Sequence, residues 1–141
     1  MSPIDPEAIE TPSLLVDLAR MERNLDRGAT YAREHGIALR PHVKTHKSPF
    51  LAREQLQRGA AGLTCATPHE AEVMSEVCDD LLVMYPPVGE RRATRLAELA
   101  QRTKLTVALD SDVAAADLSR AAVKAGSTVR VLVELDAGMH R

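Results

Sequence analysis

The chain has 141 residues, of which 45% are hydrophobic, so it is long enough for one domain with an apolar core. Its aromatic content is only 2% and its net charge is -2, so it lacks the stacking platforms and the basic field that nucleic-acid binding requires. No stretch approaches the roughly 20 apolar residues that cross a bilayer, and no export signal is visible, so we expect a cytoplasmic protein without a membrane segment. The two cysteines, Cys65 and Cys78, are too few for a disulfide framework or a four-ligand zinc site, and we expect ordinary thiols.

The beginning of the chain is expected to contain a leader, a strand and a helix. Residues 1–12 are acidic and interrupted by prolines, and we expect a flexible leader there. The run SLLVD at residues 13–17 predicts a strand. Residues 18–35 have helical periodicity and end before Gly36, a typical helix stop.

The rest of the chain alternates between short β-rich runs and longer helical segments. Strands are predicted at residues 37–44, 62–66, 80–85, 105–110 and 128–136, and helices at residues 49–59, 68–78, 89–102 and 112–125. Thr67 is the expected N-cap of helix 68–78, with Glu70 able to reach back as in a capping box, and Ser111 is the expected N-cap of helix 112–125. This alternation predicts a parallel sheet built from βα units with right-handed crossovers.

Two architectures build parallel sheets from such units: an open doubly wound sheet, and a closed (β/α)8 barrel of about 250 residues. An open dinucleotide-binding sheet carries a G-x-G-x-x-G turn, and no turn of this sequence matches that pattern. We therefore predict an α/β fold that is a partial (β/α)8 TIM-type barrel with about five of the eight parallel strands. On this hypothesis, residues 13–141 are the N-terminal portion of a barrel, and the other barrel half and a second domain are absent.

The segment RPHVKTHK at residues 40–47 carries an unusual density of positive charge. Strand alternation puts Arg40, His42 and Lys44 on one face. Burying unpaired charges costs several kcal/mol each, so this face should meet either water or an anionic group. The pattern leaves two alternatives open: a solvated strand end paired to nearby carboxylates, and a site for an anionic ligand.

Lys44 is the candidate nucleophile of this segment. Crowded positive charge favours the neutral amine, which is the form that adds to an aldehyde to give a Schiff base. The same charge would attract a phosphorylated cofactor such as pyridoxal 5'-phosphate (PLP) to the C-terminal ends of the strands, where barrel sites lie. Lys47 is the rival lysine, but it lies in the loop after the strand, where we expect it to be solvated.

Four blocks of the sequence resemble a known group of enzymes: TPSLLVDLARMERNL, LRPHVKTHKSP, GLTCAT followed by EAEVM, and VLVELDAGMHR. Together they span residues 11–141 and resemble the D-threonine aldolase and D-serine dehydratase group, distant relatives of alanine racemase with a fold type III PLP barrel. The resemblance implies that Lys44 holds PLP and that Arg141, which closes the Gly-Met-x-Arg motif, lies near the pyridoxal ring hydroxyl. For His42, two alternatives stay open: a residue that orients or acidifies the cofactor linkage, and a packed histidine bonded to backbone.

The resemblance also implies parts that lie beyond Arg141. The loop that binds the PLP phosphate, a tyrosine of the site and the ligands of a divalent metal come from later segments in the family, so we assign no metal ligand to this chain. Many relatives carry Gln where this chain has Ala66, so no polar cofactor contact is expected there. The full-length relative is expected to be a homodimer that acts on a small amino-acid substrate, with no nucleic-acid or membrane partner.

The favoured hypothesis is a PLP-dependent lyase of the D-threonine aldolase type, which cleaves D-3-hydroxy amino acids to glycine and an aldehyde. A D-serine dehydratase or an amino-acid racemase of the same fold would use the same front half. The alternative from another class is a non-catalytic PLP-binding fragment, because an unclosed sheet leaves an edge strand unpaired and the cofactor site half built. Whether the 141 residues alone are an enzyme stays open.

The remaining polar residues point to structural roles. His69 lies at the start of a predicted helix and is expected on its surface, and His46 is expected to be structural or solvated. Glu134 and Asp136 share a strand face with Arg130, and we expect ion pairing among them.

Overall fold

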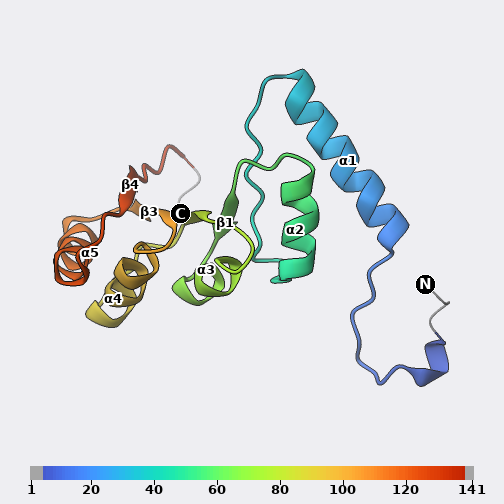
Figure 1. Cartoon of the computed structure of the whole chain (residues 1–141), viewed down its shortest axis with the longest axis horizontal. Helices are drawn as coiled ribbons and strands as arrows, with labels where there is room; N and C mark the ends of the chain where they lie inside the picture. The colour runs from blue at the N-terminus through green and yellow to red at the C-terminus, as the bar shows by residue number, and fades with distance from the viewer. Residues whose placement is uncertain (1–4, 139–141) are drawn as a thin grey trace.

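A computed structural model describes residues 5–138 of the chain (Figure 1). Its elements follow in the order η1 (Pro6–Ala8), α1 (Leu18–Glu34), α2 (Pro49–Gln57), β1 (Leu63–Cys65), α3 (Pro68–Met74), β2 (Asp80–Val83), α4 (Glu90–Leu99), β3 (Lys104–Leu109), α5 (Asp112–Ala125) and β4 (Arg130–Val133). The four strands form one parallel sheet in the order β1-β2-β3-β4. The helices α3, α4 and α5 connect them and lie side by side along the sheet (Figure 1). None of the helices among residues 5–138 is long and apolar enough to span a bilayer.

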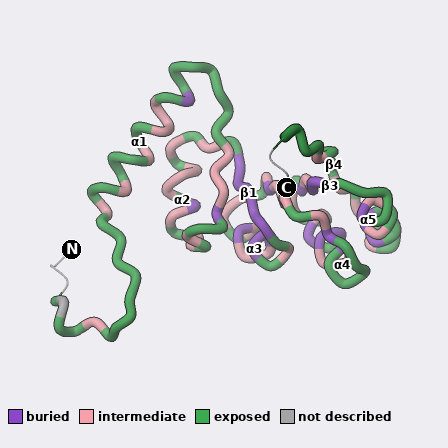
Figure 2. Tube along the Cα trace, turned by 180° about the vertical axis from the view of Figure 1, so that it is seen from behind, coloured by how far each residue is buried: buried purple, intermediate pink, exposed green. Residues whose placement is uncertain are grey.

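A continuous apolar layer fills the space between the sheet and its helices. The strands contribute two registered rows of buried side chains: Leu63, Leu81 and Leu105, then Cys65, Val83 and Val107. The helices add Met74 from α3, Leu96 from α4 and Leu118 from α5 to the same cluster. Figure 2 shows these buried positions along the strands and on the inner sides of the helices, whereas α1 and the segment before it are mostly exposed. Each large aliphatic side chain stabilises the fold by about 1.5–3 kcal/mol when buried, so this layer holds the strands in one register.

The segment expected as a strand at residues 37–44 runs beside β1 but forms a single parallel bridge, His42 to Thr64. Val43 N donates a hydrogen bond to Thr64 O at 2.9 Å, and Thr64 N donates to Pro41 O at 2.8 Å. Pro41 has no N–H to donate, and the chain turns directly after His42, so no longer ladder forms. The expected five strands are therefore four regular strands and one extended segment in the same parallel order.

The strand predicted at residues 13–17 is wrong. These residues have no strand partner in the described part of the chain, and the Leu14 side chain is fully exposed at 100%. The carboxylate of Asp17 instead caps α1 by accepting a hydrogen bond from Arg20 N at 2.9 Å. A β-rich run becomes a strand only when a neighbouring strand satisfies its backbone groups, and no described strand lies beside this one.

The helix N-termini follow the local signals in the sequence. Thr67 caps α3 by accepting a hydrogen bond from Glu70 N at 3.2 Å. Ser111 caps α5 by accepting one from Ala114 N at 3.4 Å. Both predicted N-caps are confirmed. The Glu70 carboxylate, however, accepts a hydrogen bond from the backbone N–H of Ala66 instead of that of Thr67.

Candidate functional site

Lys44 lies at the edge of the sheet where the parallel strands end. It follows the bridge at His42, and the neighbouring strand β1 ends at Cys65. The Lys44 side chain is exposed, and among residues 5–138 it has no hydrogen-bond or ion-pair partner. Reactive groups of parallel barrels lie at this carboxyl edge, so the position of Lys44 suits an amine that must meet a ligand.

The ring of His42 is tied to the backbone of Lys44. His42 is half-buried, and its Nδ1 accepts a hydrogen bond from Lys44 N at 3.3 Å. In the neutral ring the proton is therefore on Nε2. The structure thus brings His42 and Lys44 together. The contact is a hydrogen bond between the ring and the backbone, as expected for a packed histidine.

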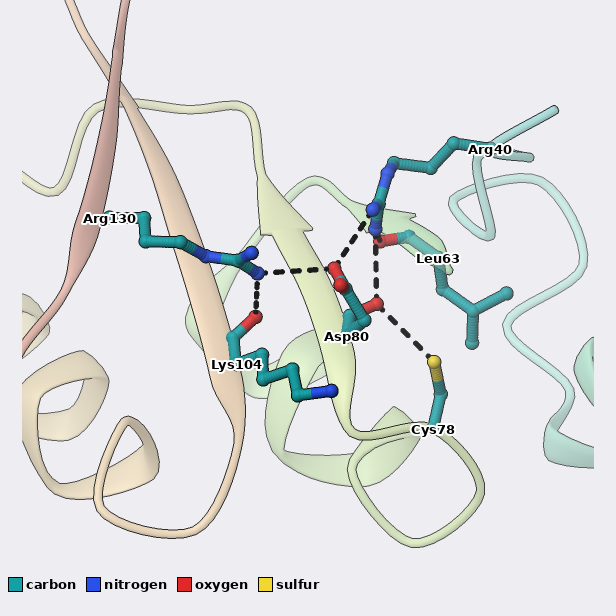
Figure 3. A network of polar contacts seen from close by, with 6 residues as sticks. All are labelled: Arg40, Leu63, Cys78, Asp80, Lys104 and Arg130. Atoms are coloured by element: carbon teal, nitrogen blue, oxygen red, sulfur yellow. Dashed lines mark hydrogen bonds and ion pairs between the residues drawn. The ribbon is translucent and has the colours of Figure 1, made fainter. Parts of the chain in front are cut away.

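Arg40 is bound to a carboxylate at the start of β2. Its guanidinium Nη2 lies 2.8 Å from Asp80 Oδ1, and Nη1 donates to Asp80 O at 3.1 Å (Figure 3). Asp80 is the first residue of β2, so this contact lies at the amino edge of the sheet, opposite to Lys44. The charge of Arg40 is therefore balanced away from Lys44, and the carboxylate-paired alternative holds for this residue.

Arg130 joins the same carboxylate from the other side (Figure 3). Its Nη2 lies 3.3 Å from Asp80 Oδ1 and donates to Lys104 O at 2.7 Å. The carboxylate that pairs with Arg130 is thus Asp80 at the start of β2, and not Glu134 as expected. The network connects the extended segment that contains Arg40 to the starts of β2 and β4, and through Lys104 O to the start of β3, so it has a structural role.

Gly62 makes room for this network. A Cβ atom at this position would lie 2.2 Å from Arg40 Nη1 and 2.6 Å from Asp80 O. Gly62 also has a φ of 156°, which side chains rarely adopt. Neither Gly62 nor Asp80 stood out in the sequence, and the only local signal was a glycine directly before a β-rich run.

Lys47 is paired with a buried carboxylate that no local sequence pattern predicted. Lys47 Nζ lies 2.5 Å from Glu70 Oε1, and Glu70 Oε2 accepts a hydrogen bond from Ala66 N at 2.7 Å. Glu70 is only 7% exposed. Burial acts to raise the pKa of Glu70, but the bonds from Lys47 and Ala66 and nearby positive charge outweigh it and hold the pKa below its ordinary value. The rival lysine is therefore engaged in an ion pair and is not simply solvated.

His46 lies between the two lysines and is half-buried in the turn. Its Nδ1 accepts a hydrogen bond from Ser48 N at 3.1 Å. Burial lowers the pKa of His46, against smaller opposing effects of Gln55 and Ser48. His46 Nε2 and Gln55 Oε1 are both buried without a hydrogen-bond partner in the described structure. These contacts support the structural role expected for His46.

A cavity of about 480 Å³ opens beside the ends of β1 and β2. Its lining includes Ala66, His69, Tyr85, Arg92 and Arg95. Arg95 is bound to Glu72 of α3, and the exposed His69 ring lies 3.8 Å from the same carboxylate, so His69 is on the helix surface as predicted. Ala66 contributes only a methyl group and backbone atoms to the cavity wall.

The two cysteines are free and protonated. Burial raises the pKa of Cys65 to about 12, and burial also raises the pKa of Cys78. Neither thiol supplies a thiolate near neutral pH, which agrees with their expected role as ordinary thiols.

Arg141, the third predicted site residue, lies outside the described residues. Within residues 5–138, no group of three or more His, Cys, Asp or Glu side chains could hold a metal ion. Of the three predicted site residues, Lys44 and His42 lie within the described residues, at the carboxyl edge of the sheet.

Comparisons with known proteins match this chain along almost its whole length. The profile of a family described as alanine racemase, N-terminal domain, matches residues 16–141. The chain is 39% identical to the D-threonine aldolase of an Arthrobacter species, covering 99% of this chain and 37% of that protein. It is 35% identical to the 3-hydroxy-D-aspartate aldolase of Paracoccus denitrificans, covering 98% of this chain and 36% of that protein.

Solved structures of related proteins also match the chain. The crystal structure of D-threonine aldolase from Filomicrobium marinum matches with a TM-score of 0.90 at 40% identity, covering 94% of this chain and 36% of that one. The D-threo-3-hydroxyaspartate dehydratase from Delftia sp. HT23 matches with a TM-score of 0.83 at 33% identity, covering 95% of this chain and 36% of that one. The chain therefore spans little more than a third of the length of these relatives. The likeness confirms the α/β fold predicted for the first part of a barrel.

Proposed function

The chain belongs to the family of alanine racemase N-terminal domains, which are parts of PLP-dependent enzymes, and from this premise we propose that Lys44 carries PLP in a lyase for D-3-hydroxy amino acids. One observation supports the choice of lysine. Arg40 and Lys47 are each bound to a carboxylate, whereas the exposed amine of Lys44 has no such partner among residues 5–138. An amine without a partner at the carboxyl edge fits attachment of an aldehyde cofactor.

The chain's own residues would do two things at this site. The neutral amine of Lys44 would hold the cofactor through its aldehyde carbon, with the aldehyde oxygen leaving as water. The ring of His42 is held beside it by the hydrogen bond from Lys44 N to His42 Nδ1. When bound, PLP withdraws electrons from a bond at Cα of the amino acid. We propose that Arg141 faces the cofactor ring and that the phosphate loop and divalent-metal ligands come from the rest of a longer, homodimeric, cytoplasmic protein.

The relatives favour the substrate class. They include a D-threonine aldolase, a 3-hydroxy-D-aspartate aldolase and a D-threo-3-hydroxyaspartate dehydratase, and all three names describe D-amino acids with a hydroxyl on Cβ. The aldolase reaction breaks Cα–Cβ and gives glycine and an aldehyde. A dehydratase of the D-serine type eliminates water, and hydrolysis of the resulting imine then releases ammonia and gives a 2-oxo acid. A racemase only inverts Cα.

The lysine assignment can be tested by trapping. Purified protein is mixed with PLP, reduced with borohydride, digested and mapped by mass spectrometry. We expect the reduced adduct on Lys44 and its loss in Lys44→Ala, whereas Lys124→Arg, a change in an exposed lysine of α5, keeps it. An adduct on another lysine, or none, would overturn the assignment.

The reaction can be tested by product analysis of the full-length protein. D-threonine, D-3-hydroxyaspartate, D-serine and D-alanine are incubated separately, with and without divalent metal. Glycine with an aldehyde or 2-oxo acid from the hydroxylated substrates supports the aldolase. A 2-oxo acid with ammonia from D-serine supports the dehydratase, and L-alanine supports the racemase.

A second candidate, PLP binding without turnover, applies to residues 1–141 alone. β4 is the last strand of the described sheet and all four of its residues are exposed, so the sheet presents an open edge on the side away from Lys44. Formation of the Lys44 adduct by the 141-residue chain, with no product from any of the four substrates, would support this candidate. Measurable turnover by that chain would exclude it.

A further inference from the structure

The turn that carries Lys44 is connected to α3 by an ion pair between the exposed side chain of Lys47 and the buried carboxylate of Glu70. Lys47 Nζ lies 2.5 Å from Glu70 Oε1, and the other Glu70 oxygen accepts a hydrogen bond from Ala66 N at 2.7 Å. Glu70 thus bridges the turn at residues 43–47 and the residue that follows β1. These two segments meet at the carboxyl edge, where Lys44 is exposed.

The carboxylate of Glu70 has little freedom to move. It is 7% exposed, both of its oxygens are bonded, and its backbone N–H donates to Thr67 Oγ1 at 3.2 Å. Thr67 is also the N-cap of α3, so the same helix start fixes both the backbone and the side chain of Glu70. Because the Glu70 carboxylate is fixed in this way, it determines where the ammonium group of Lys47 lies.

The backbone at Lys47 is held in an unfavourable conformation. Lys47 has a φ of 50°, the left-handed region that non-glycine residues adopt at a cost of about 1 kcal/mol. Its N–H donates to Val43 O at 2.7 Å, which closes the turn that contains Lys44. Such a conformation persists when surrounding contacts hold it, and the ion pair to Glu70 is such a contact.

We propose that Glu70 is a positioning residue for Lys44: through Lys47 and Ala66 it fixes the turn so that the Lys44 amine projects from the carboxyl edge in one direction. This inference rests on the proposed function of Lys44 as the PLP lysine. Glu70 touches neither substrate nor cofactor and acts only through the turn. Because a misplacement of about 1 Å can slow a reaction by about a hundredfold, the fastening matters for the rate at which Lys44 bonds the cofactor.

The test measures cofactor attachment in the full-length protein. Apoprotein is mixed with PLP, and the rate of the Lys44 adduct is followed by the absorption of the bound cofactor and by borohydride trapping. We expect Glu70→Gln and Lys47→Met each to slow attachment by about tenfold or more. The double variant should be no slower than the slower single one, because both changes remove the same interaction. Lys47→Arg should restore most of the rate, because it keeps the charge.

Glu72→Gln is the matched control. Glu72 lies in the same helix and is also ion-paired, but its partner is Arg95 of α4, away from the turn. We expect it to leave the attachment rate unchanged. Parental rates in both Glu70→Gln and Lys47→Met, or an equal slowing by Glu72→Gln, would overturn the proposal. If Glu70→Gln does not fold, Lys47→Met tests the proposal alone. The Lys47 side chain is 65% exposed, so this substitution should not prevent folding.

A measurement without cofactor separates this inference from the proposed function. Amide hydrogen exchange of the peptide covering residues 43–48 should be faster in Glu70→Gln than in the parent, with α4 unchanged. If the parent forms no Lys44 adduct, the proposed function fails, and unchanged exchange would then refute the fastening as well. If the parent forms the adduct and the variants match it, only the positioning role fails.

Discussion

Gly62 lies so close to its neighbours that no side chain fits there. A methyl group there would lie 2.6 Å from the backbone oxygen of Asp80 and would push aside the Arg40 guanidinium. Gly62→Ala should therefore lower the free energy of unfolding by about 1–3 kcal/mol, the usual cost of overpacking. Urea unfolding followed by circular dichroism measures this change.

Gly28 provides the control for that substitution. It lies inside α1, and apart from its chain neighbours and the backbone of its own helix a Cβ there would have no atom within 4 Å. Gly28→Ala should leave the fold unharmed or stabilise the helix by about 0.5–1 kcal/mol. If Gly62→Ala and Gly28→Ala changed the free energy of unfolding equally, the close approach at Gly62 would not explain the loss of stability.

His46 makes stability depend on pH. Burial lowers its pKa in the folded protein, so the unfolded chain takes up the proton first as the pH falls below the ordinary value of 6.5. The contribution of His46 to the free energy of unfolding is therefore lost progressively from pH 6.5 down to the lower folded pKa. His46→Asn keeps an acceptor for Ser48 N–H and removes the titrating ring, so it should flatten this decline. Urea unfolding at a series of pH values tests it, and an equally steep decline in the variant would contradict the prediction.

At the scale of elements, α1 is the least supported helix of the described chain. Ala32 is its one buried residue, whereas α4 buries Ala93, Leu96, Ala97 and Leu99. Arg58, which follows α2, lies 2.7 Å from Asp26 of α1 and also binds Glu54. This contact ties the middle of α1 to the rest of the fold.

We expect α1 to open at a lower free energy than α4. Its amides should exchange with solvent hydrogen faster than those of α4. Arg58→Met should make amide exchange in α1 faster still and leave the exchange in α4 unchanged. Arg91→Met, which removes an exposed arginine of α4, is the matched control. Slower exchange in α1 than in α4 would show that further contacts hold this helix.

Elements defined by neighbouring residues were predictable, and elements that need a distant partner were not. Thr67 and Ser111 mark their helices because a cap bonds an N–H only three residues away. The run at residues 13–17 has strand composition, yet only a neighbouring strand could make it one. Residues 37–44 were placed correctly beside β1, but Pro41 and the turn after His42 limit their pairing to one bridge.

In the candidate site, too, local features were predictable from the sequence and distant partners were not. The exposed position of Lys44 at the carboxyl edge followed from strand alternation and the βα order. The partners of Arg40 and Lys47 did not follow, because Asp80 and Glu70 lie 40 and 23 residues away in the chain. Glu70 matched a local capping box, and that pattern concealed its role in binding Lys47.

At the scale of the whole molecule, the sheet is covered unevenly. The helices α3, α4 and α5 cover one face of β1, β2 and β3, whereas every residue of β4 is exposed (Figure 2). Val131, Leu132, Val133 and Leu135 are among the exposed large apolar side chains. An exposed apolar edge strand offers unpaired backbone groups to other chains.

We therefore expect the 141-residue chain to associate with itself through β4 as its concentration rises. Val133 is 86% exposed on this strand, so Val133→Lys should place a charge on the edge and reduce the mass measured by light scattering. Val123→Lys is the control, because Val123 is 80% exposed on α5 and the substitution adds the same charge on a helix surface. An equal reduction by both variants would mean that net charge controls the association. A reduction by Val133→Lys alone would identify β4 as the surface that needs a partner.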